Sequence, residues 1–549
     1  MPNIKVKQIV ADFLNHFQQL NIYIKVFVIL SLVFGTSIRI FNLFNLGFIF
    51  DMVTTQYAWG KAGWEMGYFG FWKNYNGFFD YWPVTLLLEI IIYGLSLPFG
   101  GTAQNFVTIT KLFNWSVEII FCMVLVYISI YRDKKSFSKE EKKQAPIDRY
   151  SRAYINASLA YILPSLWFVS GVWGQNDTLV AFLTFSVICL LYKSRDFMQV
   201  ADTLPTFYKD SMFWTGVLLA FTFWIKQQAI LILPVLIIYH LYQKSWKNIL
   251  NFVIWLTPFV ISFMYGTILY ANGKWELTAV MGGCILLVGI LVMFIFINKN
   301  DGWINVRRQA FGFLLTTSII LIPLLFLNYQ RVGATTFSVF GRADNVANGG
   351  ATFWGLIDVN GLGSDYLIKI LSGGISVNLA GYVIYLILMT TLLWKLFDLD
   401  IKKIRTMNLQ NIFSKQITLQ QFILLMFLNT TSYFLFFTKM HSRYLHFGII
   451  FGLLSLAFLT TSKQWKNWLI LTTVFSFGYF LNQIAMYSIA IFGLSSDQPR
   501  WVYDLLAMFG FSPWKLSSLT TLICLFCFYQ ILFSVVKENS SKLKILDNI

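Results

Sequence analysis

Long apolar runs, separated by short polar segments, follow one another along the whole chain. A helix that crosses a bilayer needs about 20 mainly apolar residues, and the hydropathy pattern predicts about fourteen such helices. The predicted spans are 24–46, 105–131, 153–172, 178–194, 212–225, 228–243, 249–271, 277–297, 310–328, 377–397, 420–438, 445–462, 467–490 and 515–536. The fourth, fifth and sixth are short, so tilted or broken helices are expected there.

One further apolar run, 84–98, is short and ends at Pro98 and a pair of glycines. If it crossed the membrane, the segment 132–152 would lie outside. That segment is the most basic in the chain, and segments rich in Lys and Arg stay in the cytoplasm. We therefore predict that 84–98 is a surface helix within a long first external loop, 47–104.

Charge supports this topology. It places both termini in the cytoplasm and the long loops 47–104, 329–376 and 491–514 outside. The inner segments then hold about 29 of the 42 Lys and Arg residues, and the outer segments about 11. The formal net charge of +17 is thus mostly explained by orientation in the membrane, and nucleic acid is not predicted as a partner.

Composition sets the class of protein. The 549 residues are 57% hydrophobic, 18% aromatic and only 12% charged, whereas a soluble domain carries roughly twice that charge. A soluble enzyme, a disordered protein and a coiled coil are therefore excluded. The five cysteines fall in apolar runs without metal spacing to His, so neither a disulfide framework nor a metal site is predicted. The fold predicted is an all-α, polytopic membrane protein whose first external loop carries surface helices.

Two acids stand out in that loop. Asp51 directly follows an apolar stretch at the outer edge of the first span, and a carboxylate in a partly desolvated setting is a candidate general base. Asp80 precedes an aromatic pair and Pro83. The alternative for each acid is the capping of a short helix, at 52–64 after Asp51 and from Pro83 after Asp80.

A polar stripe runs along the second span, where Lys111, Asn114 and Glu118 are spaced i, i+3 and i+7. Residues with this spacing share one face of a helix. The favoured interpretation is a mutually satisfied Lys–Glu pair that faces the interior of the bundle. The alternative is a stripe that lines a cavity.

Three external turns concentrate polar side chains. The turn at 171–178 holds Gln175, Asn176 and Asp177, which either bind a ligand or cap the fourth span. The next external turn places Lys226 beside Gln227, where the lysine either holds a lipid phosphate or snorkels to the head groups.

The turn at 438–447 carries Lys439, His441, Arg443 and His446. Because cations are scarce on the outer side, this cluster is predicted to bind an anionic phosphate. The alternative is interfacial anchoring together with Tyr444.

Five of these motifs, in order and on one side of the membrane, resemble the glycosyltransferase C superfamily. Within it, the match is closest to bacterial proteins related to the GPI second mannosyltransferase. The motifs are Asp51 with Trp59, FFDYWP at 78–83, GVWGQND at 171–177, KQQAILILP at 226–234 and KMHSRYL at 439–445. Trp82 replaces a proline of the family pattern, and Ser442 replaces an acid. The family's spacing from lysine to acid in the second span is kept by Lys111 and Glu118.

The resemblance implies an enzyme that takes a sugar from a polyprenyl-phosphate-linked donor and transfers it, with inversion, to an acceptor outside. The acceptor is a glycolipid, a wall glycan or a protein, and no metal or other cofactor is implied. The predicted roles are general base for Asp51; substrate binding for Asp80, Tyr81, Trp82, Gln175, Asn176 and Asp177; donor phosphate for Lys226, His441 and Arg443; and support for Lys111, Glu118, Gln227 and Tyr444. The predicted domains are 1–23, a cytoplasmic and amphipathic segment; 24–462, the enzyme-like core; and 463–549, C-terminal helices with a short cytoplasmic tail.

Two other classes of protein suit many spans. The first is a transporter or flippase of lipid-linked glycans, and the second is a non-catalytic scaffold of a cell-wall assembly complex. Transporters often contain repeats and helices broken at the midplane, but no repeat is visible here and the polar groups gather at the outer edge. We therefore predict a plasma-membrane glycosyltransferase with an extracytoplasmic active site. Its sugar and its acceptor stay open.

Overall fold

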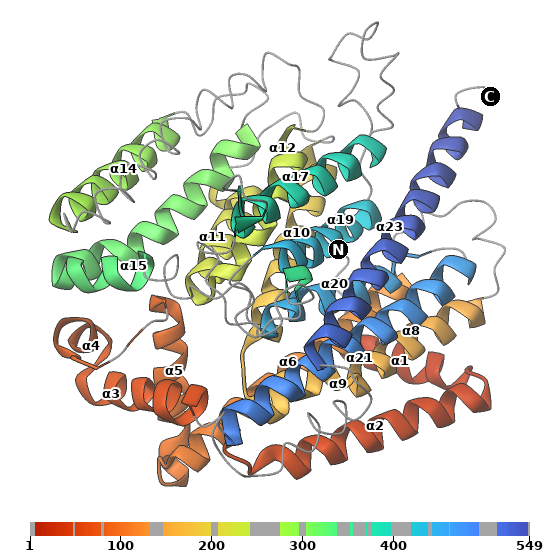
Figure 1. Cartoon of the computed structure of the whole chain (residues 1–549), viewed down its shortest axis with the longest axis horizontal. Helices are drawn as coiled ribbons and strands as arrows, with labels where there is room; N and C mark the ends of the chain where they lie inside the picture. Colours follow the sequence, from red (N-terminus) through yellow and green to blue (C-terminus); the bar gives the residue numbers. More distant parts are fainter. Residues whose placement is uncertain are drawn as a thin grey trace, which may run out of the picture.

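The computed structural model describes most of the chain and is almost entirely helical (Figure 1). The described residues are 6–47, 50–77, 79, 82–131, 146–198, 207–241, 275–295, 304–337, 352–354, 369–370, 375–396, 419–437, 442–459, 462–492 and 513–546. Within them, the one ladder pairs β1 (Lys369–Ile370) antiparallel with β2 (Ile375–Ser376). The predicted helical class is confirmed.

In chain order, the helices up to Met198 form an N-terminal group and those from Phe207 onward form a C-terminal group. In the N-terminal group are α1 (Val6–Gln18), α2 (Ile22–Leu43), the π-helix η1 (Phe50–Tyr57), α3 (Ala58–Met66), α4 (Tyr68–Asn74), α5 (Pro83–Ser96), η2 (Leu97–Phe99), α6 (Ala103–Tyr131), α8 (Pro146–Ile162), α9 (Pro164–Trp167), the π-helix η4 (Phe168–Trp173) and α10 (Asp177–Met198). In the C-terminal group are η5 (Phe207–Lys209), α11 (Ser211–Ile225), η6 (Gln227–Ile232), α12 (Leu233–Leu241), α14 (Trp275–Ile295), α15 (Ile304–Phe337), α17 (Val377–Leu396), α19 (Leu419–Phe436), η9 (Ser442–Leu445), α20 (His446–Leu456), α21 (Ser462–Phe492) and α23 (Pro513–Leu546).

Four of the described helices are long and apolar enough to cross a membrane. They are Ile22–Leu43, Ala103–Ile130, Ile304–Val332 and Lys515–Ser534. A bent pair, Arg149–Ile162 with Pro164–Trp173, is a fifth if it forms one span. The other predicted spans correspond to shorter or more polar helices, and the predicted span 249–271 lies outside the described residues.

The helix α2 shows how the exterior and interior divide. Its buried residues are Val28, Ser31, Gly35 and Arg39, which recur on one face, while large apolar side chains on its other faces are exposed. Small residues let helices approach closely in a membrane, and a Cβ on Gly35 would lie 2.6 Å from the ring of Tyr161. The buried face therefore combines small residues with one arginine, and the exposed face carries large apolar side chains.

One predicted span, 153–172, is broken in the structure, and a second, 310–328, ends at a kink within a longer helix. The run 153–172 was predicted as one helix, but it bends by 44° between α8 and α9. Leu163 is extended there (ψ 123°), because Pro164 disfavours helical geometry in the residue that precedes it. In α15, Asn328 is non-helical, and its side chain accepts a hydrogen bond from the N–H of Arg331, which starts a new helical segment.

The short spans were predicted to be irregular. The fifth is short but regular, since α11 is an uninterrupted helix of 15 residues. The sixth is broken, because the run 228–243 is divided between the 3-10 helix η6 and the nine-residue α12. The fourth is longer than predicted, since α10 continues to Met198 through polar residues.

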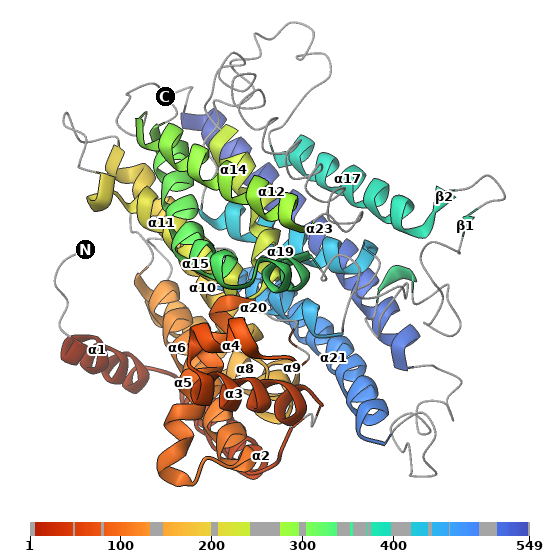
Figure 2. The same ribbon diagram turned by 90° about the vertical axis from the view of Figure 1, so that its left-hand side faces the viewer.

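The first predicted loop folds into a layer of short helices. Figure 2 shows α3, α4 and α5 beside one another, and they pack on α6, α11 and α15. The helix α5 begins with Pro83 at its first turn, as predicted. The predicted helix 52–64 is wrong in detail, because η1 has π geometry up to Tyr57 and α3 then continues to Met66.

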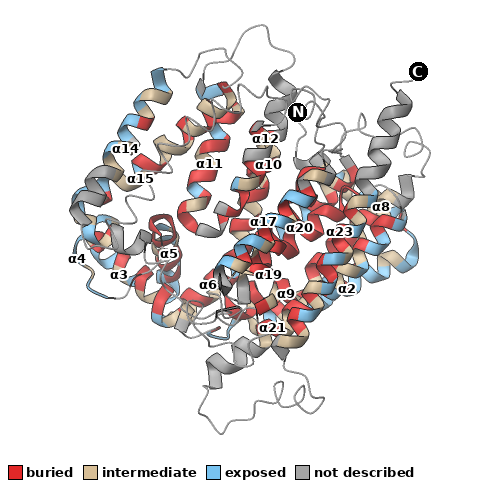
Figure 3. Cartoon of the chain, turned by 45° about the horizontal axis from the view of Figure 1, so that its top comes forward, coloured by how far each residue is buried: buried red, intermediate tan, exposed pale blue. Residues whose placement is uncertain are grey.

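The most deeply buried helices lie at the centre of the molecule (Figure 3). Every residue of α20 is buried, and buried side chains also dominate α10, α11 and α19. Around α20, the rings of Phe427, Trp468 and Phe528 pack with centroids 4.5–5.2 Å apart. His446, the first residue of α20, lies in this buried centre and contacts Thr178 of α10.

Candidate functional site

Asp51 is held at the start of η1 by two hydrogen bonds. Its Oδ2 accepts from Trp173 Nε1 at 3.0 Å and from Gln175 Nε2 at 3.1 Å. Both donors come from the motif at 171–177, about 120 residues further along the chain. Donors of this kind stabilise and orient a carboxylate. A helix cap would instead use the side chain of Asp51 to accept from the backbone of its own helix, whereas both donors here are side chains of another segment.

Two glycine turns bring these segments together. Gly47 (φ +73°) precedes η1, and Gly174 (φ +91°) ends η4. A Cβ on Gly47 would lie 2.9 Å from the carbonyl oxygen of Trp173, and one on Gly174 would lie 2.8 Å from Met52 Sδ. The two turns therefore interlock, and only glycine fits either of them without displacement.

The polar turn after Gly174 is buried. Gln175, Asn176 and Asp177 are each at most 3% exposed. Asn114 of α6 holds the turn, because its Nδ2 donates to the carbonyl oxygens of Gly174 (3.1 Å) and Gln175 (3.2 Å). Asp177 is also the first residue of α10. It therefore starts that helix and belongs to the polar cluster at the same time.

Lys226 joins this turn from α11. It ends that helix with extended geometry (φ −148°), and its Nζ donates to Asp177 Oδ1 at 2.9 Å and to Gln175 Oε1 at 3.3 Å. It is 5% exposed, so the interpretation of a snorkelling lysine is wrong. Gln175 therefore links the carboxylate of Asp51 to the ammonium of Lys226.

The cationic motif 438–447 reaches the same cluster through His446. Thr178 Oγ1 and His446 Nε2 are 2.8 Å apart, and His446 interacts electrostatically with Asp177 and Lys226. His446 was recognised only as part of a cationic turn and not assigned to the site. His441 lies outside the described residues, and Arg443 is placed only by the backbone of η9.

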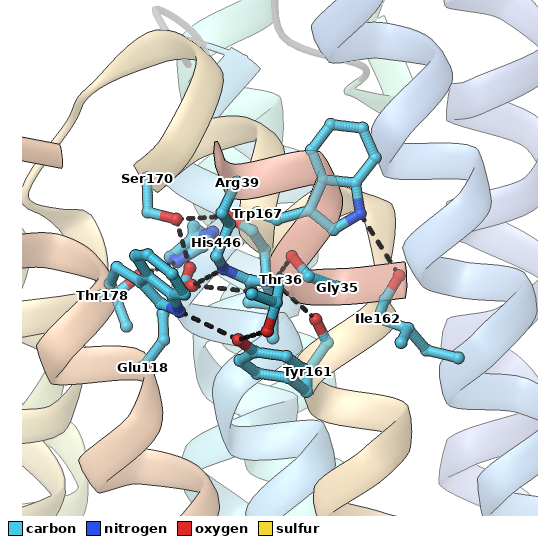
Figure 4. A network of polar contacts seen from close by, with 12 residues as sticks. Gly35, Thr36, Arg39, Glu118, Tyr161, Ile162, Trp167, Ser170, Thr178 and His446 are labelled. Atoms are coloured by element: carbon cyan, nitrogen blue, oxygen red, sulfur yellow. Dashed lines mark hydrogen bonds and ion pairs between the residues drawn. The ribbon is translucent and has the colours of Figure 1, made fainter. Parts of the chain in front are cut away.

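A second polar network lies next to this cluster (Figure 4). Arg39 and Glu118 form an ion pair of 2.7 Å, and Ser170 donates to the other carboxyl oxygen of Glu118. Arg39 also donates to the carbonyl oxygens of Gly35 and Tyr161, at 2.9 and 3.0 Å. The network ties α2, α6, α8 and η4 together, and η4 also carries Trp173, which donates to Asp51.

The predicted Lys111–Glu118 pair is wrong. Lys111 donates to the carbonyl oxygens of Asn42 and Asn45, at 2.8 and 2.7 Å, while Glu118 binds Arg39. The physical reason is distance, because seven residues of α-helix separate two side chains by about 10 Å along the axis. The lysine instead fixes the C-terminal end of α2.

A further acid, Glu89 of α5, faces the cluster. It is 0% exposed, and in the part of the chain that the structure describes neither carboxyl oxygen has a hydrogen-bond partner. Burial raises the pKa of Glu89 to about 8, and the nearby charge of Lys226 opposes that rise. Sequence analysis overlooked Glu89, although an acid within an apolar run is itself a signal.

The remaining predicted residues contribute less to the described cluster. Trp82 is 5% exposed and packs on Phe223 and Trp224, with centroids 4.5 and 4.6 Å away, so other aromatic rings occupy its surroundings. Tyr444 packs half-buried against the central core. Asp80, Tyr81 and the side chain of Gln227 lie outside the described part.

Among the described residues, no group of three or more His, Cys, Asp or Glu side chains is arranged to hold a metal ion. What the cluster offers is a carboxylate with fixed donors, a buried ammonium and amide groups between them. The chain matches no protein-family model, and a search of curated proteins returned no match.

Proposed function

We propose that the protein is a membrane glycosyltransferase that moves a sugar from a polyprenyl-phosphate-linked donor to an acceptor hydroxyl. The observation that carries the proposal is the chain of contacts Asp51–Gln175–Lys226, which joins an oriented carboxylate to a buried cation. Displacement at an anomeric carbon needs a base for the incoming hydroxyl and positive charge for the departing phosphate. The cluster contains one of each.

In this mechanism Asp51 takes the proton of the acceptor hydroxyl. The acceptor oxygen attacks the anomeric carbon from the face opposite the phosphate, and the bond from carbon to phosphate oxygen breaks with inversion. Trp173 and Gln175 fix the orientation of the base. Lys226 stabilises the negative charge that develops on the phosphate, and its N–H groups donate both to that phosphate and to Asp177.

The proposal also covers the location and topology of the protein and the further residues of its site. The chain is then a plasma-membrane enzyme of the glycosyltransferase C type with about fourteen spans, cytoplasmic termini and a site on the outer face. His441, Arg443 and Gln227 add to the phosphate site, and Asp80 and Tyr81 add to the sugar site. The acceptor is a glycolipid, a wall glycan or a protein.

The decisive experiment measures sugar transfer by the purified protein from a panel of polyprenyl-phosphate sugars. Asp51→Asn keeps the size and hydrogen bonding of the side chain but removes its basicity, so we expect turnover to fall by about 10²–10⁴. Binding of undecaprenyl phosphate should persist. The matched control is Glu65→Gln, an acid of the same loop whose side chain is 58% exposed.

Two outcomes would contradict this assignment. Near-normal turnover by Asp51→Asn would remove Asp51 as the base, and an inactive Asp80→Asn in the same series would move the role to Asp80. Movement of the labelled lipid across proteoliposomes without covalent transfer of the sugar would identify the flippase alternative instead.

A further inference from the structure

Glu89 is fixed in place by the packing of α5 on both sides. One turn earlier, Thr85 donates from its hydroxyl to the carbonyl oxygen of Ile225, the residue before Lys226. On the other side, Gly60 of α3 is so close that an added Cβ would lie 2.7 Å from the carbonyl oxygen of Glu89. The carboxyl group is therefore held beside the C-terminal end of α11.

Lys226 is the charged group that acts on Glu89, across the contact between α5 and the end of α11. The charged residues on the other helices that pack against α5 have other partners. Asp51 of η1 binds Trp173 and Gln175, and Lys61 and Glu65 of α3 pair with each other. On α6, Lys111 binds the end of α2 and Glu118 binds Arg39; Arg331 of α15 lies over the rings of Phe71 and Tyr75, and Lys73 of α4 is exposed. Protonation of Glu89 therefore depends on its burial and on the charge of Lys226.

The local charges make a neutral Glu89 useful. Asp51 and Asp177 already surround the Lys226 ammonium, directly or through Gln175. A third carboxylate would oppose any anion that approaches Lys226. A protonated carboxyl group adds no negative charge and supplies an O–H donor, which a phosphate oxygen accepts well.

We propose that Glu89 is a proton-holding residue of the phosphate site: neutral Glu89 donates a hydrogen bond to the phosphate of the polyprenyl ligand, and ionised Glu89 pairs with Lys226 and excludes that phosphate. This inference rests on the proposed function, because it uses the same lipid phosphate. No covalent step is involved. The proton stays on Glu89 while the ligand is bound.

The sign of the pH dependence follows. The helix α5 has 14 residues, too few to cross a bilayer, and belongs to the predicted external loop. With its pKa raised to about 8, Glu89 is neutral below that pH and ionises above it. A phosphate monoester loses its second proton near pH 6 and is therefore a dianion throughout that range. Affinity should fall as the pH rises through the pKa of Glu89.

The test uses the full-length protein in phosphatidylcholine nanodiscs and undecaprenyl phosphate as the probe. Equilibrium titration of the wild type between pH 7.5 and 9 should show a loss of affinity of up to about eightfold, as expected for one proton linked to binding. Glu89→Gln keeps a neutral N–H donor, so its affinity should match the low-pH wild type and vary little with pH. Glu65→Gln, the exposed control, should titrate like the wild type.

Two kinds of result would overturn the proposed role of Glu89. A flat wild-type profile does so without any variant, which covers the case in which Glu89→Gln fails to fold. A folded Glu89→Gln that keeps the wild-type pH dependence, or that binds weakly at every pH, does so as well. The proposed function is tested separately by Lys226→Met: if wild-type binding is flat with pH but is lost in this variant, the phosphate site stands and only the role of Glu89 fails. No wild-type binding at any pH overturns both.

Discussion

Arg39 is a buried charge with one charged partner, Glu118, beside two backbone carbonyl acceptors, so the carboxylate matters as much as the guanidinium. The side chains of Arg39 and Glu118 are 3% and 4% exposed and 2.7 Å apart. A buried ion pair contributes little net stability compared with apolar residues, but removing one partner leaves the other charge unpaired in a medium of low dielectric constant. The Arg39–Glu118 pair therefore specifies how α2 meets α6 more than it stabilises the fold.

We expect Glu118→Ala to destabilise the protein by about 3–5 kcal/mol, because the guanidinium of Arg39 is then buried without its carboxylate. The measurement is the free energy of unfolding in mixed micelles. The double variant Arg39→Met with Glu118→Leu should recover much of that loss, since no charge stays buried. If the double variant is as unstable as Glu118→Ala alone, the unpaired charge is not the cause.

For individual residues, the sequence predicted which polar side chains are buried better than it predicted their hydrogen-bond and ion-pair partners. The stripe of Lys111, Asn114 and Glu118 was found from its spacing, and all three side chains are buried. Their partners lie on α2 and in the turn at 174–175, more than 50 residues away in the chain, and no local spacing encodes such contacts. Glu89 could have been singled out as an acid within an apolar run, but its relation to Lys226, at the end of another helix, could not be predicted from the sequence.

Among the elements, irregular geometry positions the candidate site. The π-helices η1 and η4 and the turns at Gly47 and Gly174 carry Asp51 and its two donors. π-Helical segments are rare in proteins and occur often at functional sites. Hydropathy located the surrounding runs but could not detect this geometry, because it reports the apolar character of a run and not the number of residues in each turn. The break at Pro164 was visible in the sequence as a proline inside an apolar run.

We expect Gly174→Ala to reduce sugar transfer by about 10²-fold, as a shift of about 1 Å in a catalytic group can do. Its Cβ would lie 2.8 Å from Met52, next to Asp51, in a backbone of φ +91°. Gly67→Ala is the matched control, because its φ is +71° but an added Cβ meets nothing within 4 Å. It should lose about 1–3 kcal/mol of stability and keep its activity. Equal losses of activity in both variants would show that backbone strain alone is responsible.

The whole molecule combines an apolar core with many buried polar side chains and with a largely apolar surface. Its buried set includes charged and amide side chains from six or more helices, whereas Phe41, Phe326 and many other apolar residues are largely exposed. Inside a membrane, polar groups gain from facing one another and apolar groups lose nothing by facing lipid. This division accords with the composition, which predicted the class of protein although it could not predict any contact.

Orientation in the membrane is the last prediction, and it follows from charge rather than from shape. Because Lys and Arg concentrate in 132–152 and other inner segments, that segment should face the cytoplasm and 329–376 the outside. In a variant without native cysteines, an impermeant maleimide added to sealed cells should label Ser364→Cys and should reach Ser138→Cys only after the cells are opened. Labelling of Ser138→Cys in sealed cells would invert the map and place the cluster around Asp51 on the cytoplasmic face. The proposed lipid phosphate would then have to be bound from the inner leaflet.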